Sequence, residues 1–277
     1  MQGMISVRPV SPPAAYLGGK KRLAKRVSSI IEQTPHDLYA EPFVGMGGVF
    51  FRRSLAARCE VINDYSGDVI TLFRILQRHY PQFMEVMKFQ LTSRREFERL
   101  AATDPATLTD LERSARFLYL QRLAFGGKIM GRSFGVERHG PARFDLTRLG
   151  PILEEVHERL SGVVIENLDW RAFIDRYDRE GTLFYLDPPY FGCETDYGRE
   201  SFKRADFAEM AERLAGIKGR FILSLNDRPE VREIFSGFEF ADVKLDYTIG
   251  SGEQKAVGEV IILDGKDVRQ DRNLPLF

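Results

Sequence analysis

The sequence has few of the cysteines and histidines that build zinc sites or disulfide scaffolds, and no long apolar run. Its 277 residues include only two cysteines, Cys59 and Cys193, which lack the close spacing of a zinc-binding pair. We therefore expect neither a structural zinc nor a disulfide scaffold, and a reducing cytoplasm is the default compartment. No apolar run approaches the length of a membrane span, and the N-terminus has no uninterrupted apolar stretch of the kind found in secretory signals.

The chain also has no net charge, because 40 lysines and arginines balance 40 aspartates and glutamates. A zero sum neither supports nor excludes a nucleic-acid partner, since the distribution of charge matters more than the total. Residues 113–148 contain eight basic and two acidic residues, whereas residues 149–200 contain five basic and twelve acidic ones. A basic segment rich in glycine and arginine favours an insertion that contacts phosphates; the alternative is a solvated loop with scattered arginines.

The length suits one large α/β domain with an insertion, or two small domains. The hydrophobic fraction of 43% is enough for a substantial core. Short apolar runs alternate with stretches of helical periodicity, which predicts an α/β fold. The predicted strands are 37–40, 61–64, 163–166, 183–186 and 220–227, with a closing hairpin of 242–249 and 259–263; the predicted helices begin at 23 and 108 and span 67–89, 207–214 and 230–235, with a break near Pro81.

The most informative stretch is Asp187-Pro188-Pro189-Tyr190, directly after a predicted buried strand. Ligands bind outside the carboxyl ends of strands in open α/β sheets. Asp187 offers a carboxylate acceptor, and the stiff proline backbone aims the carbonyl of Pro188 as a second acceptor. Two acceptors can bind both N–H groups of an exocyclic amine while Tyr190 stacks on the ring. These groups fit the methylation of an amino group on a flipped-out base; the alternative is a proline turn with a surface tyrosine.

A glycine-rich stretch with Gly45, Gly47 and Gly48 follows the first predicted strand and allows close backbone approach. Asp64 lies 19 residues after Gly45, at the end of the next strand. This offset is typical of a carboxylate that binds the ribose hydroxyls of a cofactor. Phe50 stands in place of the third glycine of a dinucleotide fingerprint, so a nicotinamide cofactor fits less well.

Three further features leave alternatives open. Gly18-Gly19-Lys20 either cradles an anion or is a basic helix start, and it lacks the spacing of a Walker A loop. Trp170 either flanks the adenine of a cofactor or belongs to the core. Asn226 and Asp227 either line a base pocket or cap the helix that follows them.

These motifs resemble those of the Dam-like adenine-N6 DNA methyltransferases over nearly the whole chain. Asp187–Tyr190 resembles the catalytic tetrapeptide, Phe43-x-Gly-x-Gly resembles methyltransferase motif I, and Asn63-Asp64 resembles motif II. The resemblance implies a Rossmann-like sheet for S-adenosylmethionine-dependent methyl transfer, formed by residues 1–69 and 161–277. It places a small helical DNA-recognition domain at residues 70–160.

The resemblance also implies a reaction and its site residues. A methyl group would pass from S-adenosylmethionine to adenine N6 in double-stranded DNA, with no obligatory metal. Catalysis is assigned to Asp187, Pro188 and Tyr190, cofactor binding to Tyr16, Lys20, Phe43, Gly45, Asp64 and Asp187, and DNA binding to Arg122, Lys128 and Arg132. Relatives have Asn-Arg-x-x-Phe-Asn-Gly where this chain has residues 121–127, which leaves the target sequence open. The alternatives are methylation of cytosine N4 or RNA adenine, and nucleotide binding without catalysis.

Overall fold

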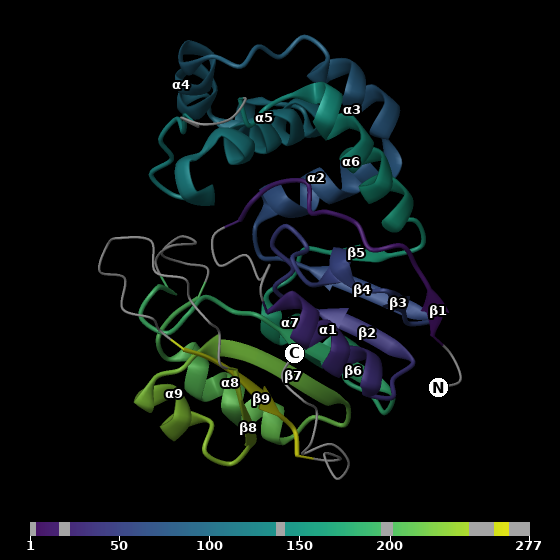
Figure 1. The fold of residues 1–277 in the computed structure, drawn as a ribbon. Helices are drawn as coiled ribbons and strands as arrows, with labels where there is room; N and C mark the ends of the chain where they lie inside the picture. Colours follow the sequence, from purple (N-terminus) through teal and green to yellow (C-terminus); the bar gives the residue numbers. More distant parts are fainter. Residues whose placement is uncertain (1–3, 17–22, 137–141, 195–201, 244–257, 266–277) are drawn as a thin grey trace.

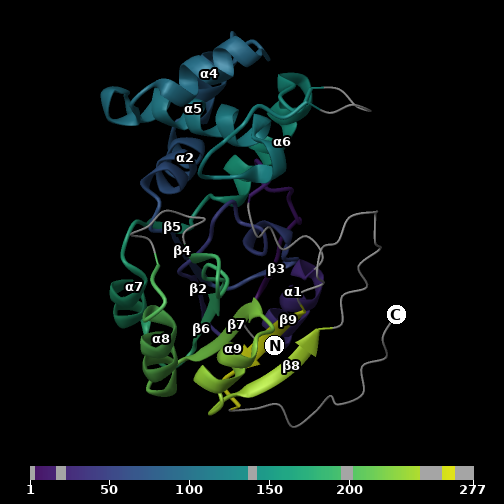
Figure 2. The same ribbon diagram turned by 90° about the vertical axis from the view of Figure 1, so that its left-hand side faces the viewer.

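The computed structural model describes residues 4–16, 23–136, 142–194, 202–243 and 258–265. A central sheet lies between helices on both of its faces, and a second group of helices gathers beyond one edge of the sheet (Figure 1). Figure 2 shows α1 on one side of the sheet and α7 and α8 on the other. In the described part of the chain, no helix combines the length and apolar character that a bilayer span requires.

The central sheet has the strand order β5-β4-β2-β6-β7-β9-β8. Its strands are β2 (Leu38–Glu41), β4 (Cys59–Asn63), β5 (Val164–Glu166), β6 (Thr182–Leu186), β7 (Arg220–Asn226), β8 (Glu239–Val243) and β9 (Glu259–Leu263), and β1 (Ile5–Ser6) pairs with β3 (Leu55–Ala56) in a separate sheet. The first five strands in this order run parallel, and β9 is antiparallel to β7 and β8. From β2, the strands that follow in the sequence lie first toward one edge of the sheet (β4, β5) and then toward the other (β6, β7). Sheets of this kind bind ligands at the point between β2 and β6 where the strand order reverses.

The predicted parallel strands and the α/β class are confirmed. The closing hairpin is also present, but its first strand is Glu239–Val243, so the predicted start at residue 242 was too late. Residues 244–249 of that prediction lie outside the described residues.

Nine helices lie in the described ranges, with three short 3-10 turns. They are α1 (Ala24–Gln33), α2 (Gly67–Arg78), α3 (Tyr80–Met87), α4 (Arg94–Ala102), α5 (Asp110–Leu123), α6 (Leu146–Arg159), α7 (Trp170–Tyr177), α8 (Asp206–Ala215) and α9 (Pro229–Ile234), and η1 (Phe50–Arg52), η2 (Pro105–Thr107) and η3 (Phe125–Gly127). The predicted break near Pro81 is confirmed, because α2 ends at Arg78 and Pro81 lies in the first turn of α3.

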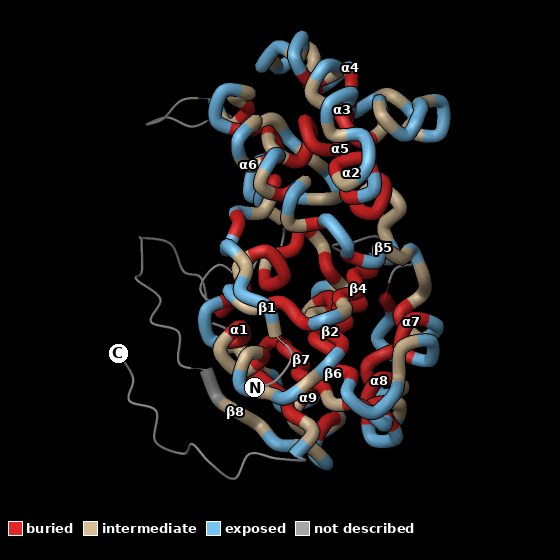
Figure 3. The backbone as a smooth tube through the Cα atoms, turned by 90° about the vertical axis from the view of Figure 1, so that its right-hand side faces the viewer, coloured by how far each residue is buried: buried red, intermediate tan, exposed pale blue. Residues whose placement is uncertain are grey.

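Two clusters of buried apolar residues fill the two faces of the sheet. On β6, Leu183 and Tyr185 belong to the first cluster, and Phe184 and Leu186 belong to the second. This strand is therefore buried on both faces, as its sequence predicts. Figure 3 shows the central strands in the buried colour and most of α4 as exposed or intermediate.

The first cluster continues from α1 through α2 into α3–α6. The helix α2 packs on β5 as well as on α5 and α6, so it joins the sheet to the helical group. A domain boundary at residue 70 would fall inside α2. The division into a catalytic domain and a recognition domain therefore stays a prediction, and α2 belongs structurally to both groups.

Candidate active site

The loops after β2, β4 and β5 are joined by one buried amide. Asn63 donates from Nδ2 to the carbonyls of Pro42 (3.0 Å) and Leu168 (3.1 Å), and its Oδ1 accepts from the Leu168 amide (2.7 Å). The Asn63 side chain is fully buried. Both polar atoms of this amide are therefore used, in three hydrogen bonds that fix the carboxyl edge of the sheet, the edge at which such sheets bind ligands.

The glycine loop after β2 is packed against Tyr16 and Asp64. Gly45 has a φ of 50°, and a Cβ there would lie 2.9 Å from Tyr16 Cδ1, so only glycine fits. Asp64 Oδ2 accepts from the Gly45 amide (2.9 Å), and its Oδ1 accepts from the Ser66 amide (2.8 Å). Burial raises the pKa of Asp64 to about 6 despite these two hydrogen bonds.

Five of the six predicted cofactor residues lie around this loop or, in the case of Asp187, directly after β6. Tyr16, Gly45 and Asp64 come together, and Phe43 is half-buried with its ring 5.9 Å from that of Phe202. Lys20 lies outside the described residues.

The Asp187–Tyr190 tetrapeptide begins directly after β6. Asp187 is half-buried, and its Oδ1 accepts from Ser224 Oγ of β7 at 3.0 Å. Ser224 Oγ also lies 3.0 Å from the hydroxyl of Tyr185. The carboxylate is therefore held by side chains whose positions are set by two neighbouring strands.

Tyr190 is held from the far side of β7. Its hydroxyl donates to Glu259 Oε1 of β9. Burial, with the nearby charges of Asp187 and Glu259, raises the pKa of Tyr190, so the phenol keeps its proton. The ring of Tyr190 is thus fixed at its outer end.

Asn226 holds the backbone just after the tetrapeptide. Its Oδ1 accepts from the amide of Phe191 and its Nδ2 donates to the carbonyl of Phe191, both at 2.9 Å. Asp227 instead forms two hydrogen bonds with Arg232 of α9, at 2.7 and 2.9 Å. No side chain caps the N-terminus of α9, so the helix-cap interpretation of these residues was wrong.

A second buried acid, Glu41, ends β2. Its Oε2 accepts from the hydroxyl of Tyr39 at 2.7 Å. Burial raises the pKa of Glu41 to about 8; the Tyr39 hydrogen bond and the Arg53 charge oppose this shift, and the Asp187 charge adds to it. Most of the Glu41 side chains are therefore protonated at neutral pH.

Sequence reasoning assigned no role to Glu41, Ser224 or Glu259. The available signal was a single polar residue within or at the end of an apolar strand. Burying such a residue costs free energy unless it finds a partner. All three have partners in the structure.

The predicted DNA-contacting residues differ in their surroundings. Arg122 donates to the carbonyls of Arg143 (2.9 and 3.2 Å) and Pro13 (3.3 Å), and burial lowers its pKa. Arg132 is half-buried, donates to Gln121 Oε1 at 3.2 Å and lies 5.5 Å above the ring of Phe117. Lys128 is exposed.

The end of α5 is bound to the N-terminal segment that carries Tyr16. Gln121 Nε2 donates to the carbonyls of Ala15 (2.9 Å) and Gly127 (2.8 Å). The bond from Arg122 to Pro13 lies beside it. The basic segment and the glycine loop are thus connected through residues 13–16.

Trp170 belongs to the core. It is the first residue of α7, is only 3% exposed, and lies in the second buried cluster with Phe202. Asp169 caps this helix by accepting from the Arg171 amide at 2.9 Å. The structure therefore favours the core interpretation of Trp170.

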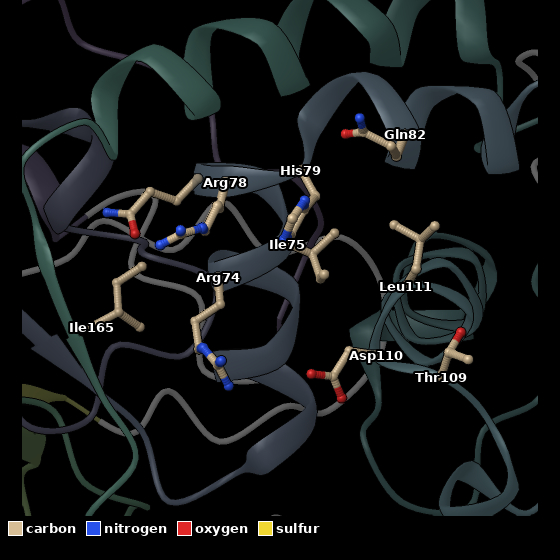
Figure 4. Close-up of a pocket in the computed structure, with 10 residues that line it drawn as sticks. Arg74, Ile75, Arg78, His79, Gln82, Thr109, Asp110, Leu111 and Ile165 are labelled. Carbon is tan, nitrogen blue, oxygen red and sulfur yellow. The ribbon is translucent and has the colours of Figure 1, made fainter.

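A cavity of about 520 Å³ lies beside β5, outside the set of predicted site residues. It is formed between α2, α3, the start of α5 and β5 (Figure 4). Its polar lining includes Arg74, Arg78, His79 and Asp110, all of them exposed side chains. It contains none of the predicted site residues. No group of three or more metal-binding side chains occurs among the residues that are described.

Comparison with known proteins finds similarity to DNA methyltransferases over most of the chain. The family model for D12 class N6 adenine-specific DNA methyltransferases matches residues 16–249. The chain is 26% identical to the DNA adenine methylase of Haemophilus influenzae, over 89% of this chain and 90% of that protein. It is 24% identical to the Type II methyltransferase M1.LlaDCHI of Lactococcus lactis (93% and 95%). It is 22% identical to the Type II methyltransferase M.CviBI of Paramecium bursaria Chlorella virus NC1A (86% and 91%).

Proposed function

Because this chain belongs to the family of D12 class N6 adenine-specific DNA methyltransferases, which methylate adenine N6 in DNA, we propose that Asp187 is its amine acceptor. The observation that carries this assignment is the position of Asp187. It lies at the carboxyl end of β6, beside the reversal of strand order, and it is anchored by Ser224. Tyr190, three residues later, is anchored by Glu259. An acceptor and an aromatic ring are thus held together at the ligand-binding edge.

The mechanism needs only hydrogen bonding and orientation from the protein. The amine of adenine is a poor nucleophile because its lone pair is delocalised into the ring. Its two N–H groups donate to the Asp187 carboxylate and the Pro188 carbonyl, which turns the lone pair toward the methyl donor. Tyr190 stacks on the flipped base. Fixed acceptors placed where positive charge develops stabilise the transition state.

The residues around the glycine loop fit S-adenosylmethionine. Gly45 lets the backbone come close to a ligand, and Tyr16 covers the loop. Each Asp64 oxygen accepts one backbone hydrogen bond and has a further lone pair that can accept from a ribose hydroxyl. When bound, S-adenosylmethionine supplies a methyl group on a positively charged sulfur. Phe43 and Lys20 are proposed as further contacts.

Double-stranded DNA is proposed to contact the segment after α5. Lys128 is exposed there, near Phe125 and Met130 in the sequence, and these two residues are each 59% exposed. Exposed basic and apolar side chains together suit phosphate contact and insertion between bases. Arg122 and Arg132 are proposed to lie near the DNA and to hold the segment in shape through their internal hydrogen bonds.

The test is product analysis with variants of Asp187. DNA methylated by the purified protein is digested to nucleosides and detected by mass. We expect N6-methyladenine, and Asp187→Ala should lower the rate by at least ~10²–10³-fold, the scale for one lost preorganised group. Asp175→Ala, which changes an exposed aspartate on α7, is the matched control. N4-methylcytosine as the main product, or near-normal turnover by Asp187→Ala, would overturn the proposal.

A further inference from the structure

Three side chains from β6, β7 and the tetrapeptide form a chain of hydrogen bonds that ends on Asp187. The Tyr185 hydroxyl lies 3.0 Å from Ser224 Oγ, and Ser224 Oγ lies 3.0 Å from Asp187 Oδ1. Tyr185 and Ser224 are fully buried. Family membership and the strand-end position of Asp187 assign no role to either residue.

The chemistry of the groups fixes the direction of this chain. An ionised carboxylate only accepts hydrogen bonds, so the proton of Ser224 points at Asp187. Ser224 Oγ is then left as an acceptor, and Tyr185 must donate to it. Burial and the charge of Asp187 raise the pKa of Tyr185, so the phenol keeps the proton that it donates. The order is therefore Tyr185 to Ser224 to Asp187.

The strand register explains why these residues meet. In the parallel pair of β6 and β7, Leu186 lies opposite Leu223, so the next positions along both strands are Asp187 and Ser224. Tyr185 precedes Asp187 by two residues and points to the same face. Among the described residues, the other ionisable groups around this chain include Tyr39 and Glu41 on β2, Tyr190 in the tetrapeptide and Glu259 on β9.

We propose that Ser224 is a positioning residue for methyl transfer and that Tyr185 holds Ser224 in its donating orientation. The inference rests on the proposed role of Asp187 as the amine acceptor. A carboxylate at a strand end can rotate about its Cβ–Cγ bond. The bond from Ser224 fixes that rotation, so that the acceptor is aimed at the amine before the base arrives. Each oxygen of a carboxylate can accept more than one hydrogen bond, so the Ser224 bond leaves capacity for the amine.

The experiment is steady-state kinetics on Ser224 and Tyr185 variants of the full chain. Ser224→Ala should lower kcat by about 10–100-fold, the range for a misaimed catalytic group, with the KM for DNA and the affinity for S-adenosylmethionine unchanged. Ser224→Thr keeps the hydroxyl and should recover most of the rate. Ser28→Ala, which removes a buried hydroxyl from α1, is the control and should behave as wild type.

A double-mutant cycle tests the role of Tyr185. Tyr185→Phe alone should lower kcat less than Ser224→Ala, because the bond from Ser224 to Asp187 remains. In the Ser224→Ala background, Tyr185→Phe should cause no further loss, since Tyr185 acts on Asp187 only through Ser224. Fully additive effects in this cycle would overturn the order of the chain. If Ser224→Ala does not fold, Ser224→Cys, which is close in size and a weak donor, is measured in its place.

The outcomes separate this inference from the function on which it rests. Wild-type kcat in folded Ser224→Ala, with Asp187→Ala inactive, would overturn the positioning role and leave the acceptor role of Asp187 intact. Equal losses in Ser224→Ala and Ser224→Thr would assign the effect to packing and also overturn it. An active Asp187→Ala would overturn the proposed function itself.

Discussion

Burial raises the pKa of two carboxyl groups at the strand ends, Asp64 and Glu41. The carboxylate of Asp64 is the form that accepts hydrogen bonds, and its pKa is raised to about 6. Asp64→Ala should weaken S-adenosylmethionine binding by about 1–3 kcal/mol, the scale of a lost hydrogen bond to a charged group. The affinity of the wild type should also fall as the pH drops below about 6, whereas that of Asp64→Asn should not. Calorimetric affinities that match the wild type at every pH would contradict this assignment.

Glu41 links burial to stability. Its pKa is about 8 in the folded protein and 4.5 as a free side chain, so the folded state holds the proton more tightly. This contribution to stability is complete below about pH 4.5 and is lost as the pH rises through about 8. Between pH 5 and 8, the free energy of unfolding of Glu41→Gln should therefore fall less steeply with pH than that of the wild type. The difference between the two slopes should be about 1 kcal/mol per pH unit. Urea unfolding at several pH values measures this slope.

The control for Glu41 is Glu98→Gln, which changes an exposed glutamate on α4. This variant should keep the wild-type pH dependence. Parallel curves for the wild type and Glu41→Gln would show that Glu41 is ionised in the folded protein across this range.

At the scale of elements, the segment after α5 carries the proposed DNA contact. Lys128→Ala should weaken DNA binding and lower the slope of log K against log salt by about one unit, as for one lost phosphate contact. Lys218→Ala is the matched control, because Lys218 is exposed and precedes β7, at the opposite end of the parallel strands. Fluorescence anisotropy over a range of salt concentrations gives both slopes. An unchanged slope for Lys128→Ala would show that Lys128 does not contact phosphate.

The sequence predicted most elements, because their signals are local. The run 183–186 is apolar throughout, and Pro81 marks a helix start, so β6 and α3 could be located. The helix α7 was missed because Trp170 resembled the end of a strand, whereas Asp169 caps a helix there. Asp169 and Trp170 alone do not distinguish these two structures.

The site was predicted less completely, because its supporting contacts join distant residues. The motif located Asp187 and Tyr190, but their partners Ser224 and Glu259 lie 37 and 69 positions away. No local pattern identifies such partners. They depend on the strand order, which brings β7 beside β6 and β9 beside β7. Arg122 was assigned to DNA from the charge of its segment and from the family resemblance, and its bonds to the backbone could not be predicted in that way.

At the scale of the whole molecule, the protein has to bring two ligands to one edge of the sheet. The residues around the glycine loop are proposed to bind S-adenosylmethionine. The segment after α5 is proposed to bind DNA. The two are joined through residues 13–16, which contact Gly45 through Tyr16 and accept hydrogen bonds from Gln121 and Arg122. These contacts form a continuous physical connection between the two sites.

This connection has a thermodynamic consequence, because any coupling between two binding equilibria is reciprocal. If S-adenosylmethionine orders residues 13–16, DNA meets a basic segment that is already in place and binds more tightly. DNA must then raise the affinity for the cofactor by the same factor. We expect Gln121→Ala to reduce both factors equally while leaving each ligand able to bind alone. The test measures the affinity for each ligand with and without the other ligand, which gives one ratio for each. Two unequal ratios would show that one of the binding measurements had not reached equilibrium.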